Sequence, residues 1–401
     1  MNILFLTMSH ITSLDQHSIY TDLMKCFVHH GHKVVIVTPS EKRYGKETYC
    51  ESDDSISVLH VKTGNLQKCG MIEKGISMLS ISRKFCKGIR KFYPDTTFDL
   101  LLYSTPPITL CNAVKRIKKT YQVKTYLMLK DIFPQNAVDI GLLSKNGIKG
   151  CLYSYFSFVE KKLYDLSDHI GCMSNGNVKY VLDNYKNIRS EKLNVCPNSI
   201  LLETNTITNE QKTSLKDRYG IPNSKKIFIY GGNLGKPQDV PFIVRCIRAA
   251  NDCSDAFFVV VGSGTDYSII KDYYDKEKPS NMIVIDQMPR DEYEQITAAC
   301  DVGLVFLDHR FTIPNFPSRI LSYMHAGIPI LACTDKNTDL KDVIKEGEFG
   351  WWCESTDEKR FVELVKSVCQ SDSSQIGRNG RIYLETHFTV EDSYRAITSC
   401  L

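Results

Sequence analysis

Short apolar runs alternate along the chain with amphipathic segments that end at glycine or shortly before proline. The first of these units predicts a strand at residues 2–8, a helix at 17–30 and a second strand at 33–39. This order and spacing are typical of a right-handed parallel unit, with which a doubly wound sheet begins. Further strands are predicted at residues 56–61, 100–104, 125–129, 169–173 and 193–196, with helices at 71–93, 109–119 and 150–166.

A polar stretch at residues 203–211 interrupts this pattern, and a second alternation of strands and helices follows it. Its strands are predicted at residues 226–230, 257–261, 282–286, 302–307 and 328–333, and its helices at 240–250, 266–276, 291–299 and 317–326. The pattern therefore predicts an α/β protein of two facing, doubly wound Rossmann-like domains, residues 1–200 and 201–401. The last helix, at 390–400, is expected to cross back to the first domain.

Candidate binding residues follow the strands of the second domain, where open parallel sheets bind ligands. Lys236 ends a glycine-rich turn and can reach a phosphate. Glycines after strands are often only turns, but several such loops in one domain favour a ligand site. The residues expected to approach the ligand are Gly232, Asn233 and Gly235 after the first strand, Gly262 and Gly264 after the second, and Met288 after the third.

The segment 314–333 packs a helix start, a helix stop and a buried strand into a short stretch. A helix that opens near Ser318 and Arg319 leaves backbone amides unpaired at the positive end of its dipole, which suits a phosphate. Arg319 supports this site because a cation there gains nothing from the helix itself. The alternative is an arginine in solvent.

Composition favours a soluble protein of a reducing compartment. The fifteen cysteines contain no CxxC pair, and 42% of the residues are apolar. The N-terminal apolar run has no basic leader, and no segment is long enough to span a membrane. We therefore expect a cytoplasmic protein, or one peripheral on the inner face of the cell membrane, with no nucleic-acid partner and no metal site.

Charge is distributed unevenly. Residues 1–200 carry 27 Lys and Arg against 17 Asp and Glu, whereas the remainder carries 23 against 29. Aromatic Tyr155 and Phe158 lie close in sequence to Lys149 and Lys161, which suits an anionic membrane surface. The competing interpretation is a core helix, with Leu152, Phe156, Val159 and Leu163 on its buried face. The basic clusters, for which solvated helix faces are the alternative interpretation, are Arg83, Lys84, Lys87, Arg90 and Lys91, and Lys115, Arg116, Lys118, Lys119 and Lys124.

The glycine loops and the segment 316–329 resemble those of the retaining glycosyltransferases of family 4, which have the GT-B fold. The resemblance extends over nearly the whole chain and is greatest to bacterial enzymes of surface polysaccharide synthesis, such as capsule or O-antigen. The chain departs from the family at two glutamates, which are replaced by Pro314 and Ser322. Ser322 is either a ribose contact or a plain helix residue.

The resemblance implies transfer of a sugar from a nucleotide diphosphate sugar, without a cofactor, to a lipid-linked or saccharide acceptor. Lys236 and Arg319 would stabilise the leaving diphosphate, and the absence of a DxD triplet predicts a metal-independent reaction. Asp131, just beyond a strand, is the candidate polar group of the first domain, unless it only caps the turn before Pro134. His10 is a weaker candidate, with a surface histidine as the alternative. Other interpretations are a nucleotide-sugar 2-epimerase and a non-catalytic nucleotide-sugar-binding protein.

Overall fold

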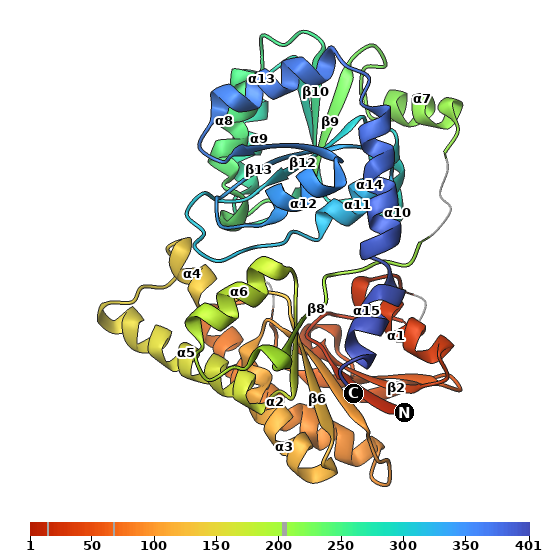
Figure 1. The fold of residues 1–401 in the computed structure, drawn as a ribbon, viewed down its shortest axis with the longest axis vertical. Coiled ribbons are helices and arrows are strands. Elements are labelled where there is room, and N and C mark those ends of the chain that lie inside the picture. Colours follow the sequence, from red (N-terminus) through yellow and green to blue (C-terminus); the bar gives the residue numbers. More distant parts are fainter. Residues whose placement is uncertain (14–15, 67–68, 203–206) are drawn as a thin grey trace. The chain divides into compact units, whose positions relative to one another are not determined.

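The computed structural model describes residues 1–13, 16–66, 69–202 and 207–401. The chain divides into two compact units (Figure 1), of which unit 1 comprises Met1–Leu201 with Val390–Leu401, and unit 2 comprises Leu202–Thr389. Part of the predicted polar break, residues 203–206, lies outside the described residues. In the described part of the chain, no helix has the length and apolar character needed to cross a membrane.

Unit 1 contains a sheet with the strand order β3-β4-β2-β1-β5-β6-β7-β8. Its strands are β1 (Asn2–Leu6), β2 (Lys33–Glu41), β3 (Tyr49–Ser52), β4 (Ile56–Thr63), β5 (Leu100–Thr105), β6 (Lys124–Leu129), β7 (His169–Cys172) and β8 (Leu193–Val195). All pairs are parallel except β3 with β4, which is antiparallel. The predicted doubly wound sheet is thus confirmed, with an antiparallel edge strand that the pattern did not predict.

The helices of unit 1 cover this sheet (Figure 1). They are α1 (Ile19–His29), α2 (Met71–Phe92), α3 (Cys111–Tyr121), α4 (Gln135–Asp139), α5 (Gly147–Leu166), α6 (Asn175–Asn184) and the C-terminal α15 (Val390–Thr398). α15 packs against α1, and Asn194 donates a hydrogen bond to the carbonyl of Ala396 at 2.8 Å. The end of the chain is therefore part of unit 1.

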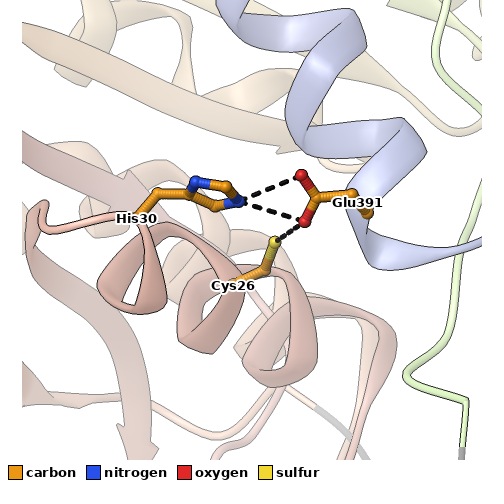
Figure 2. Close-up of side chains that lie close together, drawn as sticks. All are labelled: Cys26, His30 and Glu391. Atoms are coloured by element: carbon orange, nitrogen blue, oxygen red, sulfur yellow. Dashed lines mark hydrogen bonds and ion pairs between the residues drawn. The ribbon is translucent and has the colours of Figure 1, made fainter.

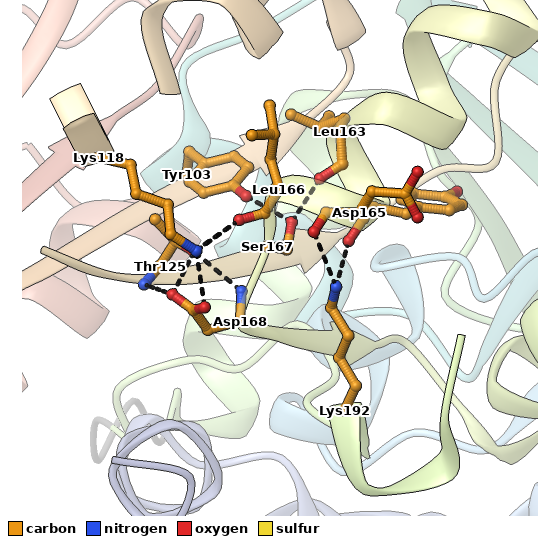
Figure 3. Close-up of polar contacts among 10 residues, drawn as sticks. Tyr103, Lys118, Thr125, Leu163, Asp165, Leu166, Ser167, Asp168 and Lys192 are labelled. Atoms are coloured by element: carbon orange, nitrogen blue, oxygen red, sulfur yellow. Dashed lines mark hydrogen bonds and ion pairs between the residues drawn. The ribbon is translucent and has the colours of Figure 1, made fainter. Parts of the chain in front are cut away.

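Two lysines hold the C-terminal end of α5 (Figure 3). Lys118 donates to the carbonyl of Leu166 at 2.9 Å and to the Asp168 carboxylate at 2.6 Å. Lys192 donates to the carbonyl of Tyr164 at 2.6 Å. These cations satisfy carbonyls that the end of a helix leaves unpaired. Although burial raises the pKa of Asp168, the hydrogen bonds from Lys118 and Thr125 outweigh it and keep this pKa below its ordinary value.

Unit 2 has a parallel sheet with the strand order β11-β10-β9-β12-β13-β14. Its strands are β9 (Lys226–Asn233), β10 (Ala256–Ser263), β11 (Met282–Ile285), β12 (Val302–Phe306), β13 (Ile330–Thr334) and β14 (Gly350–Glu354). Its helices are α7 (Asn209–Arg218), α8 (Val240–Ala249), α9 (Tyr267–Glu277), α10 (Arg290–Ala298), α11 (Arg319–His325), α12 (Leu340–Gly347), α13 (Glu358–Cys369) and α14 (Ser374–His387). Buried aromatic and aliphatic side chains between sheet and helices form its core. Both units therefore have the predicted Rossmann-like architecture.

Candidate functional site

The carboxyl ends of β9 and β10, with the loops that follow them, pack directly on each other. Gly232 and Gly262 are partners in the strand register. A Cβ on Gly262 would lie 2.0 Å from the carbonyl oxygen of Gly232, and one on Gly264 would lie 2.2 Å from that of Leu234. Gly262 also has φ +156°, a region that favours glycine. The backbones of the two loops thus require glycine at these positions, whatever ligand they approach.

Arg319 reaches these loops from the start of α11. Its guanidinium carbon lies 4.4 Å from the centre of the Tyr230 ring, and its Nη2 would lie 3.6 Å from a Cβ on Gly232. Its Nη1 is buried and has no hydrogen-bond partner among the described residues. Burial disfavours the charge, but the neighbouring Tyr230 and Tyr323 raise the pKa of Arg319 above its ordinary value. The structure therefore brings a charged, partly unsatisfied guanidinium to the predicted glycine loop.

The helix that carries Arg319 is shorter than expected. The pattern predicted a helix over residues 317–326, but α11 spans only Arg319–His325. So short a helix has a weak dipole. The group expected to bind an anion here is therefore the side chain of Arg319, and not the backbone amides at the start of α11. Ser318 is exposed, Ser322 is half-buried one turn after Arg319, and Pro314 is buried.

The other candidates of unit 2 lie around the same sheet edge. Lys236 is exposed and opens the short turn Lys236–Gln238 directly after Gly235. Asn233 is also exposed, but its side-chain amide donates to Gln238 at 2.9 Å, which braces the turn. Met288 is half-buried in the loop between β11 and α10. Of the predicted site residues, Gly232, Gly262 and Arg319 lie closest together in the described part of the chain.

In unit 1, Asp131 follows β6 at the carboxyl edge of the sheet. Asn136 donates to its Oδ2 at 2.6 Å, whereas its Oδ1 is buried without a partner in the described part of the chain. Burial raises the pKa of Asp131 to about 6. A carboxyl group with one oxygen unsatisfied and a pKa near neutrality can accept or release a proton.

Three further polar atoms at this edge are buried and lack partners among the described residues. They are Nδ1 of His10 after β1, Oγ1 of Thr105 at the end of β5, and Oδ1 of Asn198 after β8. Because these strands are neighbours or near neighbours in the sheet, the atoms mark one edge. His10 is half-buried, and the centroid of its ring lies 4.7 Å from that of Tyr44, on which it stacks.

Glu160 on α5 is a buried carboxyl group that was not among the predicted site residues. It is 2% exposed, and Tyr164 donates to its Oε1 at 2.9 Å while Tyr185 donates to its Oε2. Burial, with a smaller contribution from the charge of Asp131, raises its pKa to about 7 although the hydrogen bonds from Tyr185 and Tyr164 lower it. Asp131 and Glu160 are thus two interacting acids in one unit. The only feature of the sequence that could have pointed to Glu160 was the presence of tyrosines near it on a predicted helix.

Comparison with known proteins gives matches in sequence and in fold. Residues 211–382 match the family model described as glycosyl transferases group 1. The second unit is similar to group 1 glycosyltransferases. A probable glycosyltransferase, WbjE of Pseudomonas aeruginosa, is 25% identical over 310 residues, which cover 76% of this chain and 74% of that protein.

Solved structures agree on the fold. Sucrose-phosphate synthase of Thermosynechococcus elongatus matches with a TM-score of 0.75 and 13% identity, over 99% of this chain and 97% of that one. HepE of Anabaena, solved with UDP, matches with a TM-score of 0.68 and 13% identity, over 100% and 99% of the two chains. The two parallel-sheet α/β domains are therefore those of GT-B proteins, and the sequence matches support glycosyltransferase group 1 activity.

Proposed function

We propose that the protein transfers a sugar from a nucleotide diphosphate sugar to an acceptor, and that unit 2 binds the donor. The observation that carries this proposal is Arg319, a half-buried cation beside the Gly232 backbone, whose buried Nη1 has no hydrogen-bond partner among the described residues. An unpaired buried charge is costly unless a ligand compensates it. The diphosphate of a donor is such a ligand, and HepE has been solved with UDP and with UDP-glucose.

The main catalytic task is to stabilise the negative charge that develops on the leaving diphosphate. Arg319 would hold it through its fork of N–H groups, since guanidinium groups suit phosphate oxygens, and exposed Lys236 would add a second cation from the adjacent turn. With these two cations the reaction needs no metal clamp, which agrees with the missing DxD triplet. Retention of the anomeric configuration follows from the resemblance to family 4.

Unit 1 would bind the acceptor at the sheet edge where Asp131 lies. Its unsatisfied Oδ1 can accept a hydrogen bond from a sugar hydroxyl, and the partnerless atoms of His10, Thr105 and Asn198 provide further contacts. In its ionised form, Asp131 would anchor the acceptor hydroxyl. Ser322, half-buried on α11 one turn after Arg319, would contact the donor ribose.

An anionic membrane would present a lipid-linked acceptor to unit 1. The outer faces of α2 and α5 carry exposed apolar side chains, and α3 packs against both helices. We define the apolar docking face by Ile72, Ile76 and Leu79 on α2, and Ile148, Leu152, Tyr155 and Phe158 on α5. The first half of α5 projects beyond the sheet (Figure 1), and Leu152, expected in the core, is 45% exposed.

Exposed basic side chains lie on the same two helices and on α3. Lys74, Arg83 and Lys87 on α2 and Lys149 on α5 are exposed, as are Lys115, Arg116 and Lys119 on α3. Lys118 and Lys124 do not contribute, because Lys118 pairs with Asp168 and Lys124 donates to the carbonyl of Leu401. A surface-polysaccharide role is supported by the fold shared with WaaG, which is involved in lipopolysaccharide biosynthesis.

The proposal is tested by thermal shift of the full chain with a panel of nucleotide diphosphate sugars. A donor at a hundred times its dissociation constant adds ~2.7 kcal/mol to the free energy of unfolding. The Arg319→Ala variant, which lacks the diphosphate contact, should show no shift. An unchanged melting temperature with every nucleotide sugar would contradict donor binding. Nucleotide release without an acceptor would favour the 2-epimerase, and binding without turnover a non-catalytic protein.

A further inference from the structure

A cluster of three potential metal ligands joins α1 to α15, away from the proposed donor and acceptor residues. Cys26 lies in the last turn of α1, His30 is the residue that caps the C-terminal end of this helix, and Glu391 comes from the first turn of α15. Figure 2 shows the three side chains pointing toward one another. They combine a thiol, an imidazole and a carboxylate, which are the ligand types that Zn²⁺ binds.

The distances in this cluster fit a tetrahedral ion. His30 Nε2 lies 3.0 Å from both carboxylate oxygens of Glu391, and Cys26 Sγ lies 3.5 Å from its Oε2. The ligand atoms of all three residues lie within 4.8 Å of one another. In a tetrahedral zinc site, bond lengths of 2.0–2.3 Å separate such atoms by about 3.3 to 3.8 Å. Small side-chain movements would therefore accommodate the ion.

Aromatic stacking holds the imidazole ring of His30 in place. The His30 ring stacks on Tyr394 with centroids 4.0 Å apart and an angle of 6° between the planes. The Tyr394 hydroxyl lies 3.0 Å from Nε2 of His32, which fixes the tyrosine in turn. Glu391 and His30 are partly exposed and Cys26 is buried, so the cluster is open to solvent on one side. Water can occupy the fourth position of the ion there.

A second group of potential ligands, in unit 2, lacks these properties. Asp239, Asp308 and His309 also lie close together. However, both carboxylate oxygens of Asp308 accept hydrogen bonds from Arg310, and Asp239 accepts one from the amide of Phe242 at the start of α8. Those carboxylates already have partners, and the group contains no thiol.

We propose that Cys26, His30 and Glu391 bind a zinc ion that fastens the C-terminal helix α15 to α1. The ion would replace the present His30–Glu391 ion pair with direct bonds to both helices. α15 is the part of unit 1 that is most distant in sequence, so a bond here stabilises the return of the chain. Zinc binds cysteine as the thiolate, so binding would release the thiol proton of Cys26.

The test uses Co²⁺ as a spectroscopic probe for zinc in the metal-free, reduced full chain. Wild-type protein should bind a single ion per chain with a thiolate-to-cobalt charge-transfer band and the intense visible bands of tetrahedral cobalt, and Zn²⁺ should displace it. Cys26→Ser should lose the charge-transfer band, and Glu391→Gln should bind about 10²-fold more weakly. The matched controls, Cys151→Ser at an exposed thiol and His29→Gln beside His30, should behave as wild type.

Glu391 is 45% exposed, so its substitution by glutamine should leave the fold intact, which circular dichroism of the metal-free variant checks. Zinc should raise the melting temperature of wild type and leave that of Glu391→Gln unchanged. Absence of a thiolate band in wild type, or equal metal affinity in wild type, Cys26→Ser and Glu391→Gln, would overturn the proposal and leave an ordinary ion pair.

Discussion

The guanidinium group of Arg319 lies over the ring of Tyr230, 4.4 Å from its centre, although the two residues are far apart in sequence. Tyr230 belongs to β9 just before the glycine loop, and Arg319 opens α11. The ring supports the planar cation through a cation–π contact and aligns it along the loop backbone. Position and charge of the guanidinium are therefore set before any ligand binds.

Arg319→Ala and Lys236→Ala should each lower kcat by ~10²-fold or more, because each removes a cation from the developing diphosphate charge. Arg319→Lys should also be impaired, since lysine keeps the charge but lacks the planar fork and the stacking on Tyr230. Steady-state kinetics with donor and acceptor measure these effects. Lys359→Ala, at an exposed lysine on α13, is the control. Wild-type rates in both alanine variants would remove these residues from the catalytic assignment.

Asp131 should give the reaction a pH dependence. Its pKa of about 6 means that it is protonated below this value, and a protonated carboxyl group is a poorer anchor for the acceptor hydroxyl. We expect kcat/KM for the acceptor to fall below pH 6, and Asp131→Asn to lower kcat/KM and abolish this limb. Asn136→Ala, which removes the hydrogen bond to Oδ2, should shift the limb to higher pH. If kcat/KM of Asp131→Asn still fell below pH 6, the pH dependence would belong to another group.

Glu160 should make the stability of unit 1 depend on pH. Burial raises its pKa from 4.5 to about 7, so the folded state retains its proton where the unfolded chain has lost it. Its contribution is thus fully present below pH 4.5 and is lost as pH rises through about 7. The loss corresponds to roughly 3 kcal/mol. In chemical denaturation at several pH values, the free energy of unfolding of Glu160→Gln should not show this loss with rising pH, whereas that of the exposed control Glu191→Gln should show it. If the free energy of unfolding of wild type and Glu160→Gln changed with pH in the same way, the prediction would be wrong.

Sequence patterns predicted the fold well because long alternations of apolar strands and amphipathic helices determine a doubly wound architecture. The elements they missed are short or polar. β3 reads YCES, and α6 opens with Asn175, Gly176 and Asn177, residues that favour turns. β14 reads GWWCE, too short for a period to emerge. Their places in the structure come from pairing with β4 and β13 and from the Ser174 cap of α6.

The sequence predicted only those parts of the candidate site that lie at the ends of strands. Glycines after β9 and β10 were identified, but their packing on each other depends on strand register. The contact of Arg319 with Tyr230 joins α11 to β9, and no local sequence pattern predicts such a long-range contact. Glu160 was missed because a single glutamate on a helix gives no sign of burial. Roles of the selected residues in catalysis stay predictions.

Chelation should leave catalysis intact, because Arg319 and Lys236 supply the positive charge at the diphosphate and the chain has no DxD triplet. Initial rates with EDTA, measured well below the melting temperature, should equal those without it. The zinc site proposed on α1 and α15 would affect thermal stability under EDTA and not the initial rate. Activity lost with EDTA and restored by Mg²⁺ or Mn²⁺ would show that a metal takes part in the reaction.

Unit 1 should bind anionic liposomes through its apolar docking face. Exposed lysines and arginines near an anionic surface are worth ~1 kcal/mol each, and the aromatic rings of Tyr155 and Phe158 would enter the headgroup region. In flotation assays, the full chain should float with anionic vesicles at low salt and much less at high salt, because salt screens these charges. With neutral vesicles, recovery should be low.

Substitutions separate the apolar from the electrostatic contribution. Tyr155→Ser with Phe158→Ser should reduce flotation while leaving the charge unchanged, and Lys115→Gln with Lys119→Gln should reduce it chiefly at low salt. The matched control is Ile382→Ser, since Ile382 is 58% exposed on α14 of unit 2 and outside the apolar docking face. Because all these side chains are exposed, their loss should leave donor binding by unit 2 intact. Equal recovery with anionic and neutral vesicles, or none with either, would exclude electrostatic docking and favour a soluble acceptor.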